Sequence, residues 1–154
     1  MIDIADYKGF YLQKGTGIVK ESNAEWGIVV KKFDWSCMML KPKEYASTDF
    51  KDQNGKYTFV PQVLKFESGK MKLTFLYIGA YNTFYQNLVA FQTYLANGGE
   101  FKFQDQFSGI GRQNVRWTDS EAPDVISKNK ADGDIFTFGM TFEFDDPITD
   151  IILV

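Results

Sequence analysis

The sequence predicts a mainly β protein of the α+β class: an antiparallel β-sandwich or split β-barrel with one α-helix, at about residues 83–97, packed on it. First, apolar and polar residues alternate along several segments, which is typical of strands with one buried face. Second, one segment repeats its apolar residues at helical spacing instead. Third, the length of 154 residues suits a single domain spanning residues 1–154.

The first third of the chain predicts short strands followed by a long connection. Residues 7–17 hold an aromatic cluster and end in glycines, which favours a short strand or an arm. Residues 24–40 are apolar and contain β-branched residues, which favours one or two strands. Residues 41–57 are polar and contain the turn signal Asn54-Gly55. Because this connection is long, we expect an extended loop that works at a contact.

A β-hairpin is predicted next, with residues 57–67 and 70–79 on either side of the turn Ser68-Gly69. In its second strand, four large apolar residues occupy alternate positions and therefore share one face. They are Met71, Leu73, Phe75 and Tyr77.

The predicted helix has a start signal, an apolar stripe and a stop signal. Thr83 and Gln86 have the spacing of a capping box, in which side chains satisfy backbone N–H groups. Asn97-Gly98-Gly99 tolerates positive φ and ends the helix. Between these signals, one helical face carries a stripe that we expect to pack on the sheet. The stripe consists of Phe84, Leu88, Phe91 and Leu95.

Beyond the helix the sequence predicts a strand pair and a loop. Residues 100–107 and 112–118 alternate in polarity on either side of a glycine-rich turn. Residues 118–133 are polar and contain Pro123, which favours a loop.

The clearest strand pattern covers residues 136–144, where four phenylalanines and one methionine alternate with smaller or polar residues. Asp145-Asp146-Pro147 ends it. Residues 148–154 form a short apolar tail, which fits either an internal edge strand or a contact with another subunit.

Charge and cysteine content bound the class of partner and the compartment. The net charge is −3 and the pI is about 5.0, which argues against a specific nucleic-acid partner or an anionic membrane. A single cysteine, Cys37, excludes an intrachain disulfide, and its apolar neighbours predict a buried, inert thiol. The acidic first residues do not resemble a signal peptide, and the sequence has no apolar run of membrane-spanning length. We expect a protein made in the bacterial cytoplasm.

Catalytic signatures are scarce. Without histidine, Ser-His-Asp and Cys-His sites and imidazole-bound zinc are excluded. Gly15-Thr-Gly17 and Gly109-Ile-Gly111 lack the rest of a dinucleotide fingerprint, and the calcium-loop pattern around Gly55 fails because Phe50 and Pro61 would hold ligand positions. We therefore expect no cofactor, no metal and no enzymatic activity.

Two functional alternatives stay open at this point. A carboxylate-dependent hydrolase would draw its acid and base from the acidic residues of the second half. These are Glu100, Asp105, Asp119, Glu121, Glu143, Asp145 and Asp146. A β-sandwich binding module for a carbohydrate or small hydrophobic ligand would use an exposed tryptophan among Trp26, Trp35 and Trp117.

The order of elements carries a family resemblance. A turn-rich stretch from Leu40-Lys-Pro-Lys-Glu44 to Asp52-Gln-Asn-Gly55 precedes a strand with Lys72-Leu-Thr-Phe-Leu76, then one helix, then strands ending in Phe142-Glu-Phe-Asp-Asp-Pro147. This order resembles tail components of long-tailed bacteriophages and prophages. It is most similar to the N-terminal domain of distal tail proteins and the tail-tube fold, over residues 40–147.

The resemblance implies structural work. Members of that family form rings, usually hexameric, that continue the tail tube or join it to the baseplate, and they offer no catalytic residues to carry over. This chain departs from many distal tail proteins because it ends soon after Asp-Asp-Pro, where they continue into a second domain. The position along a tail and the ring size stay open.

We accordingly expect a homo-oligomer that contacts itself and other tail proteins, and is located in the virion tail. Strand edges must be paired or covered, and a closing ring of head-to-tail contacts achieves this. The candidate interface residues come from the N-terminal arm, the long loop and the apolar tail. They are Tyr7, Phe10, Tyr11, Tyr45, Phe50, Ile148, Ile151, Ile152, Leu153 and Val154.

Overall fold

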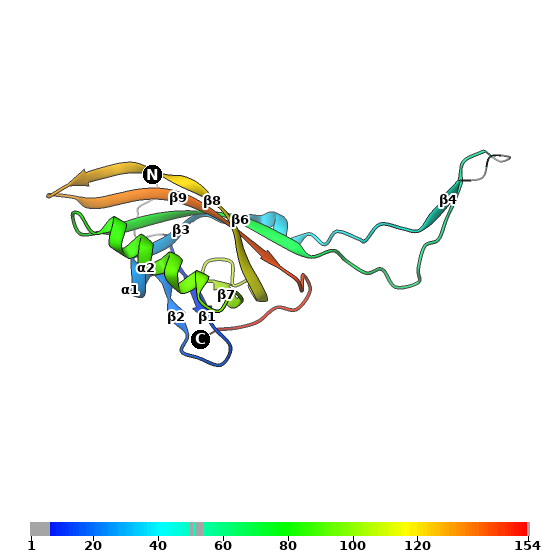
Figure 1. Ribbon diagram of the computed structural model, residues 1–154, viewed down its shortest axis with the longest axis horizontal. Helices are drawn as coiled ribbons and strands as arrows, with labels where there is room; N and C mark the ends of the chain where they lie inside the picture. The colour runs from blue at the N-terminus through cyan, green and yellow to red at the C-terminus, as the bar shows by residue number, and fades with distance from the viewer. Residues whose placement is uncertain (1–6, 50, 52–53, 154) are drawn as a thin grey trace.

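The computed structural model describes residues 7–49, 51 and 54–153. Its body is one open antiparallel sheet of seven strands in the order β2-β1-β7-β8-β9-β6-β3, and a separate two-stranded sheet lies far from the body (Figure 1). The elements in chain order are β1 (Phe10–Gln13), β2 (Lys20–Glu21), α1 (Ser22–Trp26), β3 (Ile28–Lys32), the 3-10 helix η2 (Trp35–Met38), β4 (Ser47–Asp49), β5 (Lys56–Thr58), β6 (Gly69–Gly79), α2 (Phe84–Ala96), β7 (Phe101–Asp105), β8 (Gly111–Asn129) and β9 (Gly133–Phe144). The predicted mainly β class is confirmed.

The sheet curls so that its two ends approach each other. The backbone N–H of Val30 in β3 donates to the carbonyl of Lys8, just before β1, at 2.9 Å. Beside this contact, buried Ser22 accepts from the N–H of Phe10 and donates to the carbonyl of Ile28, which ties β1 to β3. Strand β3, at one end of the strand order, is therefore joined to β1, the second strand from the other end, around one core.

The core lies between the concave face of the sheet and helix α2. The predicted alternation in β6 is confirmed, because Met71, Leu73, Phe75 and Tyr77 are all buried. In β9, Phe138, Met140, Phe142 and Phe144 are buried as well. Burying each such side chain contributes roughly 1.5–3 kcal/mol, so these two paired strands hold much of the fold together.

Helix α2 crosses this face as the stripe predicted, with Phe84, Phe91 and Leu95 buried. The predicted capping box is wrong, since the Thr83 side chain makes no cap bond. Instead the backbone N–H groups of Thr83 and Phe84 each donate to Asp134 Oδ2 at 3.0 Å. A carboxylate from β9, about fifty residues away in sequence, thus replaces the local cap.

Residues 24–40 contain one strand, β3, as predicted, and it begins after the short helix α1 ends at Gly27 with φ 71°. Two other expectations fail for identifiable reasons. Residues 57–67 do not pair with β6: β9 lies along one edge of that strand, and β3 pairs with the other edge from Thr74 to Tyr77. Residues 118–133 are not a loop: β8 continues to Asn129, and a register shift between Glu121 and Asp124 accommodates Pro123.

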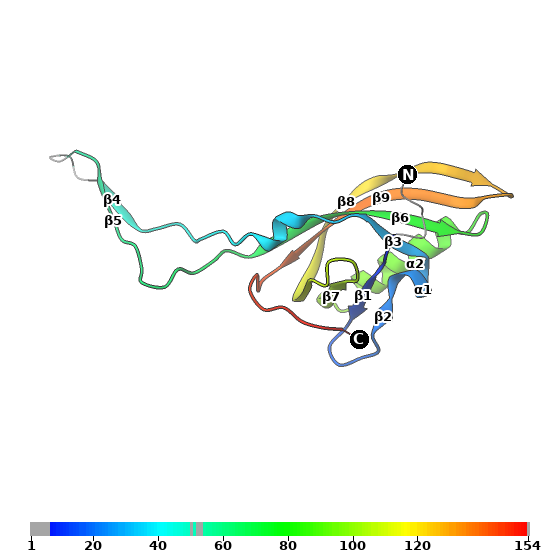
Figure 2. The same ribbon diagram turned by 180° about the vertical axis from the view of Figure 1, so that it is seen from behind.

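Residues 40–68 form a long arm that projects away from the body (Figures 1 and 2). Its two branches are joined by backbone hydrogen bonds of 2.8 Å, from Glu67 N–H to the Lys41 carbonyl and from Lys43 N–H to the Lys65 carbonyl. Strands β4 and β5 pair farther out. The described residues of the predicted extended loop at residues 41–57 lie in the outgoing branch of this arm and include β4.

Candidate assembly interface

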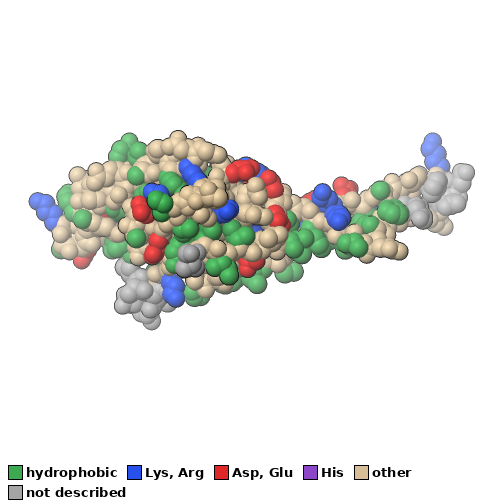
Figure 3. Space-filling model, turned by 90° about the horizontal axis from the view of Figure 1, so that it is seen from below, with side chains coloured by type: hydrophobic (Ala, Val, Ile, Leu, Met, Phe, Trp, Pro, Cys, Tyr) green, Lys and Arg blue, Asp and Glu red, His purple; other side chains and the backbone are tan. Residues whose placement is uncertain are grey.

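The arm exposes apolar side chains that its own body does not cover. Phe59 is 58% exposed, and Tyr45, Val60 and Val63 are also exposed. Figure 3 shows apolar side chains among the charged ones along the arm and the neighbouring body surface. Exposed apolar side chains that gather on one part of a surface are typical of an interaction site.

An aromatic hollow of about 520 Å³ lies at one end of the sheet, beside β3. We call it the basic groove; its lining consists of Tyr7, Lys8, Val30, Lys31, Lys32, Phe33, Trp35 and Phe107. Trp35 is 48% exposed and Phe107 is 66% exposed. The Trp35 ring stands edge-on to Phe33 at 5.1 Å and to Phe107 at 6.2 Å, so the apolar floor is built from contacting rings.

Among the described residues, the second half of β8 has no strand paired to one of its edges. Pairing with β7 covers only the stretch from Gly111 to Val115, whereas pairing with β9 continues to Asn129. We call residues 118–129 the β8 edge. It carries three acidic residues, Asp119, Glu121 and Asp124, and the exposed pair Val125 and Ile126. An unpaired edge of this length is a template for another strand.

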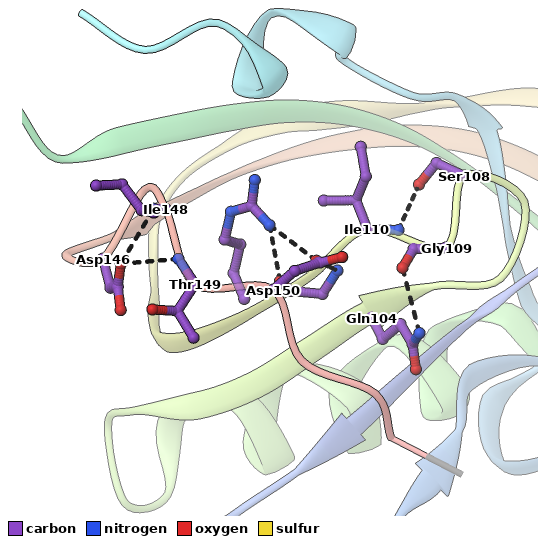
Figure 4. Close-up of polar contacts among 10 residues, drawn as sticks. Gln104, Ser108, Gly109, Ile110, Asp146, Ile148, Thr149 and Asp150 are labelled. Atoms are coloured by element: carbon purple, nitrogen blue, oxygen red, sulfur yellow. Dashed lines mark hydrogen bonds and ion pairs between the residues drawn. The ribbon is translucent and has the colours of Figure 1, made fainter. Parts of the chain in front are cut away.

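The C-terminal tail is fastened to the body rather than free (Figure 4). Asp146 Oδ1 accepts from the N–H groups of Ile148 and Thr149 at 3.0 and 3.1 Å. Hydrogen bonds from the Thr149 side chain and backbone, and then from Ile148, lower the pKa of Asp146 to about 2. Asp150 Oδ1 accepts from the Gly111 N–H at 2.7 Å and from Arg112 Nη1 at 3.0 Å.

The last described residues anchor the tail further. The N–H of Leu153 donates to Gln104 Oε1 at 2.6 Å, and the Leu153 side chain is buried. The tail therefore lies against the body without becoming a strand, and it leaves Ile148 and Ile152 exposed.

The candidate interface residues separate into exposed and buried groups. Phe10 belongs to the core, because its ring packs 5.0 Å from Phe75 and 5.2 Å from Phe103. Phe10 and Leu153 are thus corrected from contact residues to internal ones. Of the others, Tyr45, Ile148 and Ile152 are exposed, and Tyr7, Tyr11 and Ile151 are partly buried. Phe50 and Val154 lie outside the described residues.

The sequence reasoning missed the basic groove and the β8 edge. Phe33, Trp35 and Phe107 come from separate segments, and only the curl of the sheet brings them together. The local signal for the β8 edge is the run Asp124-Val125-Ile126, in which two apolar residues lie inside a polar stretch.

Three of the candidate acidic residues gather at one exposed hollow. Asp119, Glu121 and Glu143 line one hollow of about 500 Å³. However, Lys72 Nζ lies 2.7 Å from Glu121, and Arg116 lies 3.8 Å from Glu143, with all four side chains more than a third exposed. Exposed, neutralised carboxylates lack the burial that tunes a general acid.

Cys37 is buried, as predicted, and burial raises the pKa of its thiol to about 11, so the reactive thiolate is suppressed. The described residues contain no cluster of three His, Cys, Asp or Glu side chains suited to a metal. Within the same residues, no helix has the length and apolar character needed to cross a membrane.

No family model matches the sequence, and no curated protein matches it. Among solved structures, the chain is similar to the Dit protein (gp 19.1) of phage SPP1, described as a paradigm of the hub adsorption apparatus in phages that infect Gram-positive bacteria. The TM-score is 0.56 at 10% identity, over 91% of this chain and 51% of that one. The chain thus matches about half the length of SPP1 Dit and resembles that phage hub protein in fold.

Proposed function

We propose that this protein is a structural subunit of a phage or prophage tail, in the tube, the distal tail or the baseplate connector, and that it acts by ring assembly rather than catalysis. The observation that carries the proposal is the fold shared with SPP1 Dit over 91% of the chain. Its partners would be further copies of itself and other tail proteins.

The strand directions support a ring. Strands β8, β9, β6 and β3 are neighbours, and every pairing among them is antiparallel. Strands β8 and β3 therefore run in opposite directions at the two ends of this group. Two copies placed side by side in the same orientation would bring β8 of one antiparallel to β3 of the next. Such a contact is heterologous, and its repetition by rotation closes a ring.

The arm supplies a second contact. It extends beyond the body, and its apolar residues gain stabilisation only when another chain covers them. A neighbour in the same ring or a subunit of an adjoining ring satisfies this requirement.

The test is the assembly state of the purified chain. Size-exclusion chromatography with light scattering and electron microscopy should show closed rings at high concentration. A matched variant that replaces residues 42–66 with a short Gly-Ser linker should keep the circular dichroism of the body and lose the rings. If the native chain stays monomeric, both alone and when co-expressed with the products of neighbouring genes, the proposal fails.

A second candidate function follows from the basic groove. An exposed Trp35 beside Phe107 in a hollow is the concave aromatic group that a carbohydrate-binding module needs, whereas Trp26 is buried in the core. Titration with soluble cell-wall oligosaccharides, followed by tryptophan fluorescence, tests it. Trp35→Phe should abolish a saturable signal and Trp117→Phe should not; a native protein with no saturable change contradicts this function.

A further inference from the structure

We propose that, within the ring of the proposed function, the β8 edge of one copy docks into the basic groove of the next, and that opposite charge selects this pairing. The occupant of the groove is thus a second copy of this chain. The inference rests on the proposed ring and adds the residues that would decide which edge meets which.

The groove carries a local excess of positive charge on an acidic protein. Lys8, Lys31 and Lys32 are all exposed at its rim, although the chain has a net charge of −3. Asp34 is an acidic residue near the groove, but its carboxylate is already hydrogen-bonded. The backbone N–H of Ser36 donates to Oδ1 and that of Lys72 donates to Oδ2, each at 3.0 Å. The floor below the lysines is apolar, so an acidic segment with apolar side chains fits this site.

The β8 edge has the matching composition. Asp119, Glu121 and Asp124 bring negative charge, and Val125 and Ile126 bring exposed apolar surface. Glu121 is already paired with Lys72, but Asp119 and Asp124 have no ion pair among the described residues. The β8 edge and the basic groove beside β3 therefore present unpaired charge of opposite sign.

The charged residues of the β8 edge and of β3 lie on the same face of the sheet. Asp119 is opposite Thr141 in β9, which is opposite Lys72 in β6. Lys32 is opposite Thr74, two residues along the same strand from Lys72, so Lys32 and Asp119 occupy the same face of the sheet.

The apolar residues of the two edges lie together on the opposite face, the one that faces the core. Val125 is opposite Phe136, and Phe136 is opposite the buried Tyr77, so Val125 lies on the core face. Val30 shares that face, because it is opposite the buried Phe75, and Val30 lines the groove. Edge-to-edge docking would thus bring acid to lysine on one face and apolar to apolar on the other.

Backbone pairing alone would specify this contact poorly. Register shifts interrupt β8 between Trp117 and Asp119, between Glu121 and Asp124, and between Val125 and Ser127. On the other side, the Lys8 carbonyl already takes the N–H of Val30, which covers part of the β3 edge. Because backbone hydrogen bonding between the two edges would be interrupted, side-chain charge would decide which edges pair.

Charge reversal provides a direct test. The variants K31E/K32E and D119K/D124K should each need at least tenfold more protein to assemble, because like charges then face each other. A one-to-one mixture of the two should regain assembly, since each acidic groove then finds a basic edge and each basic groove an acidic edge. The variant K102E/K130E makes the same change in net charge as K31E/K32E but away from the groove, and it should assemble as the native chain does.

The outcomes separate the two proposals. Rings that form equally well from native and reversed chains would overturn the charge inference and leave the ring intact. Reversed chains that keep native circular dichroism but fail to assemble when mixed would also overturn it. A native chain that never assembles, alone or with its neighbours, would remove both proposals. If the inference holds, raising the salt concentration weakens native assembly more than it weakens assembly of the charge-depleted variant K31Q/K32Q/D119N/D124N.

Discussion

The body and the arm of this protein are built on opposite principles. In the body, long strands and α2 enclose contacting aromatic rings, with Phe75 within 6.2 Å of Phe10, Phe91, Phe138 and Phe142. In the arm, a few backbone hydrogen bonds join two thin branches whose apolar residues face outward. The body is stabilised by burial within the chain, whereas burial of the arm's apolar residues depends on the assembly proposed above. Stability and assembly should therefore respond to different substitutions.

The largest effect should come from the centre of the body. Phe75→Ala removes a fully buried ring that touches four others, so it should lower the free energy of unfolding by about 3–5 kcal/mol. Urea denaturation followed by tryptophan fluorescence measures it. A loss below 1 kcal/mol, with an unchanged denaturant slope, would contradict this description of the core.

Acid should weaken the attachment of α2. Burial raises the pKa of Asp134, but hydrogen bonds from the N–H groups of Asn82, Phe84 and Thr83, together with Lys128, lower it below its usual 3.8 overall. Because the folded-state pKa is the lower one, its stabilisation is complete well above pH 3.8 and is lost as the pH falls through the folded value.

The midpoint temperature of thermal unfolding, measured as a function of pH, tests this prediction. Asp134→Asn should lower the midpoint at neutral pH and flatten its decline below pH 4 relative to the native chain. Asp132→Asn, at the exposed hairpin tip, is the matched control and should leave both unchanged. An Asp134→Asn chain with the native acid profile would show that other carboxylates govern this transition.

A smaller effect is expected at the other end of α2. Lys14 Nζ donates to the carbonyls of Tyr94 and Asn97 and lies 4.3 Å from the centre of the Tyr94 ring. Lys14→Ala leaves these terminal carbonyls without their cation, which should cost about 0.3–1 kcal/mol. Chemical denaturation measures the loss, and Lys102→Ala serves as a control with no role in this helix. Equal losses in the two variants would contradict a specific role for Lys14.

The smallest effect on stability should come from the arm. Phe59→Ser and Val63→Ser change exposed side chains, so the free energy of unfolding should stay within about 0.5 kcal/mol of the native value. Assembly, measured by light scattering, should nevertheless be lost, and trypsin should cut the arm of the monomer before the body. An arm variant that unfolds the body would end the separation between the two regions.

The sequence by itself determined the elements whose signal is local and periodic. Alternation from Met71 to Tyr77 and from Phe136 to Phe144 predicted two strands, because a pleated strand must turn every second side chain to the core. The stripe from Phe84 to Leu95 predicted α2 for the equivalent helical reason. These patterns depend only on neighbours along the chain.

The tertiary structure decided what depends on distant partners. Pro123 and its polar neighbours read as a loop, yet β9 supplies a ladder that keeps β8 extended across a bulge. Asp134 caps a helix from fifty residues away. Residues 57–67 do not pair with β6, whose edges pair with β9 along its length and with β3 from Thr74 to Tyr77. The basic groove and the β8 edge also depend on which strands pair with which. A segment's own sequence does not determine its pairing, because each strand edge can bond to any segment that the fold brings beside it.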